Sequence, residues 1–198
     1  MNWRAARRSV ESVFRRGFRT WAERTSLRVR QKLKLSPSSP LDPSPLAELL
    51  GVSVVASRDL SDLPADVRRR LENDHRDCWS AITVTDGRGH LIVTNPSHAQ
   101  TRLNSSLAHE LAHIILGHEP SMMFMSPKSG TALRTHNEEQ EEEANWLAGC
   151  LLLPREALMF IRRGRMSDED ACSQYGVSLA MLRFRFNVTG VDVQLRHR

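Results

Sequence analysis

The hydrophobic and polar positions of the chain divide it into short elements with either a helical or a strand period. Apolar residues at helical spacing predict long helices over 97–117 and 138–153, and Pro154 ends the second one. WSAITV and HLIVTN are typical of β-strands, and the DGRG between them favours a hairpin. VSVVAS (52–57) is a third strand candidate, and LSDLPADVRRRLEND (60–74) is a helix candidate. Strands and long helices in one chain indicate an α+β fold.

Residue types that commonly cap helices support several of these boundaries. Ser97 with Gln100 fits a capping box at the start of the first long helix, and Gly117 suits the left-handed position at its end. Asn137 is the expected N-cap of the second long helix. We predict that the intervening segment, residues 119–136, is a loop.

The first 35 residues combine helical periodicity with many basic side chains. Residues 1–36 hold eleven Lys and Arg against two acids. Such a basic amphipathic helix is suited to an anionic membrane, to nucleic acid, to a partner protein, or to packing on its own domain. SPSSPLDPSP (36–45) follows as a Pro/Ser linker. We therefore predict a basic amphipathic N-terminal helix and linker over 1–40, with membrane contact as one open alternative.

Composition places the chain among ordinary globular proteins. It is 40% hydrophobic and 26% charged, without an apolar run as long as a membrane span and without the apolar core of a secretory signal. Its three cysteines are too scattered for a disulfide framework. We expect a reduced, cytoplasmic protein.

The clearest chemical signal is HELAHIILGH, residues 109–118. Positions i and i+4 lie on one face of a helix, so His109 and His113 can direct both imidazoles at one metal ion. Glu110 projects beside them, where it can accept a proton from a water at the metal. Catalytic zinc normally takes three protein ligands, so this interpretation requires a third ligand elsewhere.

The third ligand is expected from EEQEEEAN, at the start of the second long helix. A third histidine within the first motif would have to occupy position 119, where the chain has Glu119. The apolar stripe of the second helix includes Ala144, and stepping back three positions selects Glu141 as the inward carboxylate. Glu138 is the next best choice by the same count.

The same count assigns the other polar residues of this helix. Asn145 falls on the face of Glu141 and could accept the second N–H of a ligand histidine, which would fix its tautomer. Glu142 and Glu143 are expected to point to solvent, where they favour the helix dipole.

Residues 155–198 are expected to be helical. Ser167 with Asp170 fits a capping box, and Ser178 opens a last helix after a glycine-containing turn. This order has the shape of a helix-turn-helix, with Arg183 and Arg185 on the second helix as possible DNA or partner contacts. The segment is only mildly basic, so a structural or docking role is favoured over DNA binding.

Three runs together, PLAELLGVSVV, SLAHELAHIILGH and EEEANWLAGCLLLP, resemble the ImmA/IrrE family of zinc metallopeptidases over about residues 41–190. The resemblance implies a gluzincin-like site in a zincin-like domain, which we place at 41–154. It implies a small mixed β-sheet packed on an active-site helix, followed by the helix-turn-helix-like region at 155–198.

The resemblance also implies a function. Zn²⁺ would be held by His109, His113 and Glu141, with Glu110 assisting the attack of water on a peptide carbonyl. Characterised members cleave a helix-turn-helix transcriptional repressor and so derepress stress or mobile-element genes. His136 and His118 are candidates for stabilising the oxyanion. The alternative is a non-enzymatic regulator of the same fold that binds a repressor or DNA without cutting it.

Overall fold

The computed structural model describes residues 14–61, 69, 79–85, 89–118, 123–125, 132–134 and 137–196. Three predictions lie wholly or largely outside these residues: the first part of the basic helix, most of the helix expected over 60–74, and the role of His136. The described residues form an α+β fold, as predicted, with a small mixed sheet and several helices.

A three-stranded mixed sheet covers one side of the long helix that carries the histidines. The strands are β1 (Ser53–Ala56), β2 (Ala81–Thr85) and β3 (His90–Thr94), in the order β1-β3-β2. β2 and β3 pair antiparallel, with Thr85 opposite His90, which confirms the hairpin predicted around DGRG. β1 pairs parallel to β3, so the sheet is mixed.

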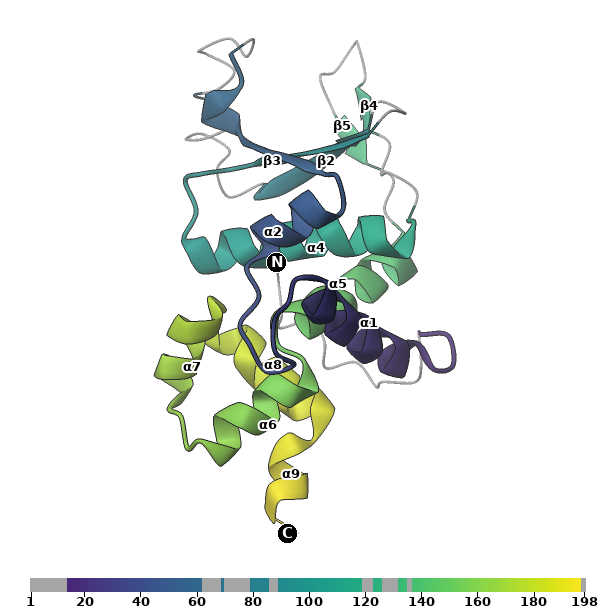
Figure 1. Cartoon of the computed structure of the whole chain (residues 1–198). Helices are drawn as coiled ribbons and strands as arrows, with labels where there is room; N and C mark the ends of the chain where they lie inside the picture. The colour runs from purple at the N-terminus through teal and green to yellow at the C-terminus, as the bar shows by residue number, and fades with distance from the viewer. Residues whose placement is uncertain are drawn as a thin grey trace.

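The helices form the layers beneath this sheet (Figure 1). α4 (Gln100–Leu116) and the short α2 (Pro43–Leu49) lie directly below it, and α5 (Glu138–Leu152) packs on α4 from the far side. The interior between them is closed by apolar side chains without exposed area, including Ile92, Leu111 and Leu147. This packing fixes the relative position of α4 and α5, the two helices that carry the site.

The caps predicted for α4 and α5 are formed at Gly117 and Asn137 but not at Ser97. Gly117 ends α4 in the left-handed conformation at φ 67°, and the Asn137 side chain accepts the backbone N–H groups of residues 139 and 140, as expected. The capping box at Ser97 is wrong, because α4 begins after Ala99 and has no side-chain cap. Ser97 instead donates its backbone N–H and its hydroxyl to the Asn95 side chain, which forms a turn before the helix.

The segment predicted to be a loop contains a second small sheet. β4 (Met123–Met125) and β5 (Ala132–Arg134) pair antiparallel, with Phe124 opposite Leu133. The prediction over 119–136 is wrong for these two strands, which are three residues each and therefore too short for a clear alternation of polar and apolar positions.

The basic N-terminal helix packs on its own domain. Within the described residues, α1 (Phe18–Lys32) begins after Gly17, whose φ of 87° interrupts the continuous helix expected from the sequence. One face is buried against α5, where the Ser26 hydroxyl donates to the Cys150 carbonyl and Arg30 donates to the Leu152 carbonyl. α1 therefore contributes to the core rather than projecting from it.

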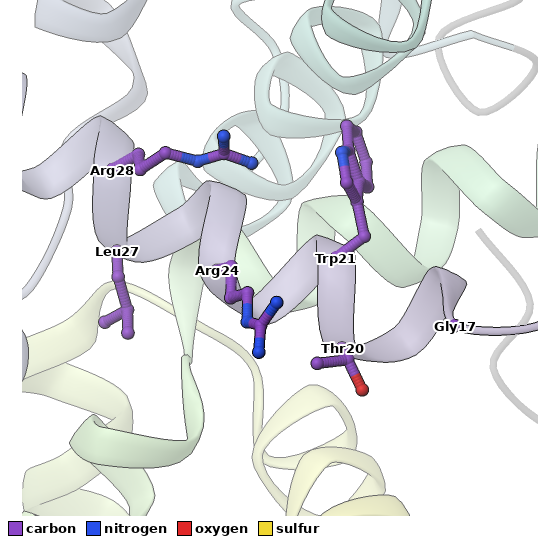
Figure 2. A pocket seen from close by; sticks show the side chains of 6 residues that line it. All are labelled: Gly17, Thr20, Trp21, Arg24, Leu27 and Arg28. Atoms are coloured by element: carbon purple, nitrogen blue, oxygen red, sulfur yellow. The ribbon is translucent and has the colours of Figure 1, made fainter.

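The opposite face of α1 carries a surface groove (Figure 2). Six residues line it, and all belong to α1 or its N-cap: Gly17, Thr20, Trp21, Arg24, Leu27 and Arg28. None of them belongs to the histidine-bearing helix. This face combines the exposed Trp21 with two arginines, Arg24 and Arg28, so the tryptophan lies among basic side chains rather than in the core.

Four helices complete the described chain at the end away from the sheet (Figure 1). They are α6 (Arg155–Arg163), α7 (Asp168–Tyr175), α8 (Leu179–Thr189) and α9 (Val191–Arg196). Ser167 and Ser178 cap α7 and α8 through their hydroxyls, as predicted. The Tyr175 hydroxyl donates to the Ser38 carbonyl at 2.7 Å, which anchors the Pro/Ser linker to α7.

None of the described helices is by itself long and apolar enough to cross a membrane. α5 and α6 meet the length and composition limits only when they are taken as a pair, and this pair is bent by 43°.

Candidate metal centre

Two histidines and a glutamate converge where α4 meets α5. His109 and His113 are one turn apart on the face of α4 that packs against α5. Glu141 lies in the first turn of α5, which Asn137 caps. The two imidazoles and the Glu141 carboxylate form a candidate metal-binding cluster with the three residues that were predicted as ligands.

The distances between the donor atoms fit a tetrahedral zinc ion. Nε2 of His109 lies 3.1 Å from Nε2 of His113 and 3.3 Å from Oε2 of Glu141. Nε2 of His113 lies 3.6 Å from Oε1 of Glu141. Two ligands bound to zinc at about 2.05 Å in tetrahedral geometry are about 3.3 Å apart. Two imidazole nitrogens and a carboxylate are also the donor types that zinc prefers, so the residues fit the ion.

Glu110 is held beside this cluster by the sheet. Its side chain is on α4 next to His109, and the residue is buried at 6% exposure. The Thr83 hydroxyl on β2 donates a 2.5 Å hydrogen bond to Oε2 of Glu110. Thr83 was not identified from the sequence, because only the register of β2 over α4 brings it to the site.

The predicted hydrogen bond between Asn145 and a ligand histidine is not formed. Oδ1 of Asn145 and Nδ1 of His109 are both buried, and neither has a hydrogen-bond partner among the described residues. Nδ1 of His113 is bonded by a different residue, His118, at 2.9 Å. Nε1 of Trp146, Oε2 of Glu156 and Nη1 of Arg185 are also buried without a partner among the described residues, so such atoms do not by themselves mark the site.

His118 and Glu143 occupy positions that the sequence analysis did not expect. Glu143 was assigned to solvent, yet it is buried at 8% exposure and its Oε2 lies 3.2 Å from Nε2 of His118. The assignment is wrong because α5 is covered on two sides, by α4 and by α1. Both ring nitrogens of His118 are engaged behind His113, so its predicted role as an oxyanion stabiliser is also wrong.

Two further candidates were Glu138, the second choice of ligand, and His136, the second candidate for stabilising the oxyanion. Glu138 is exposed on the first turn of α5 and is absent from the cluster formed by the described residues. His136 lies outside the described residues.

The two arginines of the helix-turn-helix-like region have different environments. Arg183 has a side chain that is 66% exposed, with its Nε 3.9 Å from Asp168. Arg185 is fully buried, and its guanidinium donates to Glu23 of α1 and to the Leu153 carbonyl. The prediction of a DNA or partner contact is therefore wrong for Arg185, because packing against α1 removes it from the surface.

A helix that carries H-E-x-x-H, completed by a carboxylate from a following helix, defines a metallopeptidase-like site. Residues 47–187 match the peptidase M78 family, which is described as the IrrE N-terminal-like domain, and the chain belongs to this family. Members are typically zinc-dependent peptidases. The resemblance to the ImmA/IrrE family is thereby confirmed.

Other comparisons add information on the fold alone. A solved structure described as a Mycobacterium tuberculosis transcriptional regulator aligns with a TM-score of 0.52 at 15% identity. The alignment covers 84% of this chain and 46% of that one, so this chain spans less than half the length of the regulator. No curated protein matches the chain.

Proposed function

We propose that this chain is a cytoplasmic zinc-dependent endopeptidase that cuts a protein partner, a helix-turn-helix transcriptional repressor. The observation that carries the proposal is the convergence of His109, His113 and Glu141 at donor distances of 3.1–3.6 Å, with Glu110 held beside them. Membership of a peptidase family supports the reaction class. A neighbour in fold described as a transcriptional regulator supports the regulatory setting.

His109, His113 and Glu141 would hold the zinc ion. When bound, zinc supplies Lewis-acid polarisation of the scissile carbonyl and makes the attacking water more acidic. Glu110 is the residue that accepts the proton of this water and delivers it to the leaving amine. The hydroxyl of Thr83 donates to Oε2 of Glu110 and so fixes the orientation of the carboxylate that takes part in proton transfer.

The sheet also offers a surface for the substrate. β2 is an outer strand in the described part of the sheet, and its Thr83 contacts the catalytic carboxylate. An extended peptide that pairs with an outer strand gains backbone hydrogen bonds without requiring a particular side-chain sequence. We propose that an extended segment of the repressor lies along β2 during cleavage.

Metal content tests the site first. Wild-type protein, Glu141→Ala and the control Glu142→Ala are purified without chelator and their zinc is measured by atomic emission. Glu142 is the exposed neighbour of Glu141 on α5. About one zinc per chain is expected for the wild type and the control, and much less for Glu141→Ala. Full occupancy in Glu141→Ala would move the third ligand elsewhere.

Cleavage tests the activity. The zinc-loaded protein is incubated with candidate helix-turn-helix repressors, beginning with any that is encoded beside its gene, and new termini are identified by mass spectrometry. Glu110→Gln should bind zinc normally and lose about 10²–10⁴-fold of the cleavage rate, the contribution typical of a general base. A wild type that binds zinc and the repressor but leaves it intact would favour the non-enzymatic regulator.

A further inference from the structure

The turn after α4 brings the imidazole of His118 into contact with that of His113, a proposed metal ligand. Gly117 adopts the left-handed conformation, and the N–H groups of Gly117 and His118 donate to the carbonyls of Ile114 and His113 at 3.1 and 3.0 Å. These two bonds define a Schellman motif, in which the side chain after the glycine contacts the side chain five residues earlier. A hydrophobic pair usually occupies these positions, and here it is replaced by two histidines.

The contact between the two imidazoles is polar. Nδ1 of His118 lies 2.9 Å from Nδ1 of His113, and the ring planes are inclined at 68°. Nε2 of His118 lies 3.2 Å from Oε2 of Glu143 on α5. The His118 and Glu143 side chains are only 7% and 10% exposed, so water competes little for these bonds. Arg15 approaches the other carboxylate oxygen at 3.9 Å but is 90% exposed, so it adds little.

Only one distribution of protons satisfies this chain of contacts when both rings are neutral and His113 binds a metal. Nε2 of His113 faces His109 and Glu141, so it must present a lone pair and the proton must be on Nδ1. Nδ1 of His118 must then accept that proton, which places the proton of His118 on Nε2. The Glu143 carboxylate can only accept, and it is the group that Nε2 of His118 contacts.

We infer that His118 and Glu143 are positioning residues that fix the tautomer and ring orientation of His113. The inference rests on the proposed zinc site, and it deepens that proposal by naming the groups behind one ligand. Outer partners of ligand histidines commonly hold the second ring N–H in this way, and their loss costs about 10–100-fold in metal affinity. His109 differs, because its Nδ1 has no partner among the described residues. The two ligand histidines are therefore oriented by different means.

The first test measures zinc affinity by competition with a chelator of known affinity. His118→Ala and Glu143→Ala should each bind zinc about 10–100-fold more weakly than wild type. The control Glu142→Ala removes a carboxylate one position away on the exposed side of α5 and should match the wild type. Glu143→Gln retains an acceptor oxygen and should lose less affinity than Glu143→Ala. Equal zinc affinity in the wild type and both alanine variants would overturn the inference.

The second test observes the proton directly in the zinc-free protein. Ring-nitrogen NMR of ¹⁵N-histidine-labelled protein should show His113 protonated on Nδ1, and His118→Ala should convert it to a mixture of tautomers. Melting curves of the zinc-free variants show whether a change in tautomer is accompanied by loss of folding. His118→Gln offers both an acceptor and a donor, so it should bind zinc more tightly than His118→Ala. His113 protonated on Nε2 in the wild type would overturn the inference. A wild type with this tautomer that binds no zinc would instead refute the proposed function.

Discussion

Two largely buried polar clusters lie against α5, and they differ in whether they include a permanent cation. The cluster of His109, His113 and Glu141 brings three electron-pair donors to within 3.1–3.6 Å and contains no fixed cation of its own. The cluster of Arg185 and Glu23 at the junction of α1 and α8 contains a permanent cation, matched by a carboxylate and by the Leu153 carbonyl. The first arrangement offers three ligand atoms to a metal ion, and the second pairs a cation and a carboxylate of the chain itself.

This difference distinguishes a binding site from an ion pair that holds helices together. Donor atoms of the types that zinc prefers, converging at the spacing of zinc ligands, indicate a binding function. A buried arginine with its own carboxylate holds elements together instead. Arg30 on α1 also links elements, but through neutral acceptors: it donates to the Ser39 and Leu152 carbonyls and to the Ser26 hydroxyl, and it remains a cation at neutral pH although burial lowers its pKa to about 10.

The largest expected effect comes from breaking the ion pair between α1 and α8. Arg185→Ala removes the ion pair with Glu23, whose carboxylate still accepts the Arg155 backbone N–H. The loss should cost about 3 kcal/mol, the lower end of the range for buried pairs, because Glu23 is partly exposed. We expect the free energy of unfolding in urea to fall by this amount, whether or not zinc is present. A loss below about 1 kcal/mol would show that the pair does not hold α1 to α8. The exposed Arg183→Ala is the matched control.

The next largest effect is a stabilisation of the fold by added zinc, which depends on the metal cluster. At a zinc concentration about 100 times the dissociation constant, binding should stabilise the wild type by about 2.7 kcal/mol. His113→Ala should lose this increment and change little in zinc-free buffer. The measurement is the melting temperature with and without zinc. An equal increase in the variant would mean that the zinc-dependent stabilisation arises elsewhere.

A smaller effect is expected on the sheet side of the cluster. Thr83→Val removes the hydroxyl that donates to Glu110 and keeps the shape of the side chain. Cleavage of the repressor should slow by about tenfold, which corresponds to about 1.4 kcal/mol, the usual contribution of one hydrogen bond to a charged group. Zinc content should be unchanged. Wild-type cleavage rates in Thr83→Val would show that Glu110 is positioned without β2.

The smallest effect concerns the surface of α8. Arg183→Ala should change the free energy of unfolding by less than about 0.5 kcal/mol, as is usual for an exposed side chain. If α8 contacts DNA, the variant should bind duplex DNA more weakly and with a shallower dependence on salt. Identical DNA binding by the wild type and the variant at low salt would leave Arg183 without a role in nucleic-acid contact.

The sequence predicted the elements and residues whose positions follow from local periodicity. The convergence of His109, His113 and Glu141 follows from one-turn spacing on α4 and from the apolar stripe of α5, so helical geometry was sufficient. Glu143 was misassigned because a single apolar stripe implies one buried face, whereas α1 covers a second face of α5. Arg185 was misassigned because a helix-turn-helix pattern does not show that α1 reaches α8 and buries this arginine. Only tertiary packing reveals such a face.

His118 is an intermediate case. It is one residue out of step with position 119, which a third histidine ligand would have to occupy, and the helix was expected to end just before it. A left-handed glycine at 117 folds the next residue back over the helix end, so the pair His113 and His118 could have been expected from the Schellman pattern. Thr83 could not have been found in this way, because its place depends on how the sheet lies over α4.

The link between α1 and the rest of the domain has a consequence for the order of folding. Glu23 meets Arg185 across 162 positions of the chain, and Ser26 and Arg30 reach α5 across 124 and 122 positions. Closing such long loops precedes any energetic gain, so these contacts form late. During synthesis, α1 emerges before α5 and α8, so it gains these neighbours only after the residues between them have been made. Until then its apolar face is available to chaperones and to aggregation.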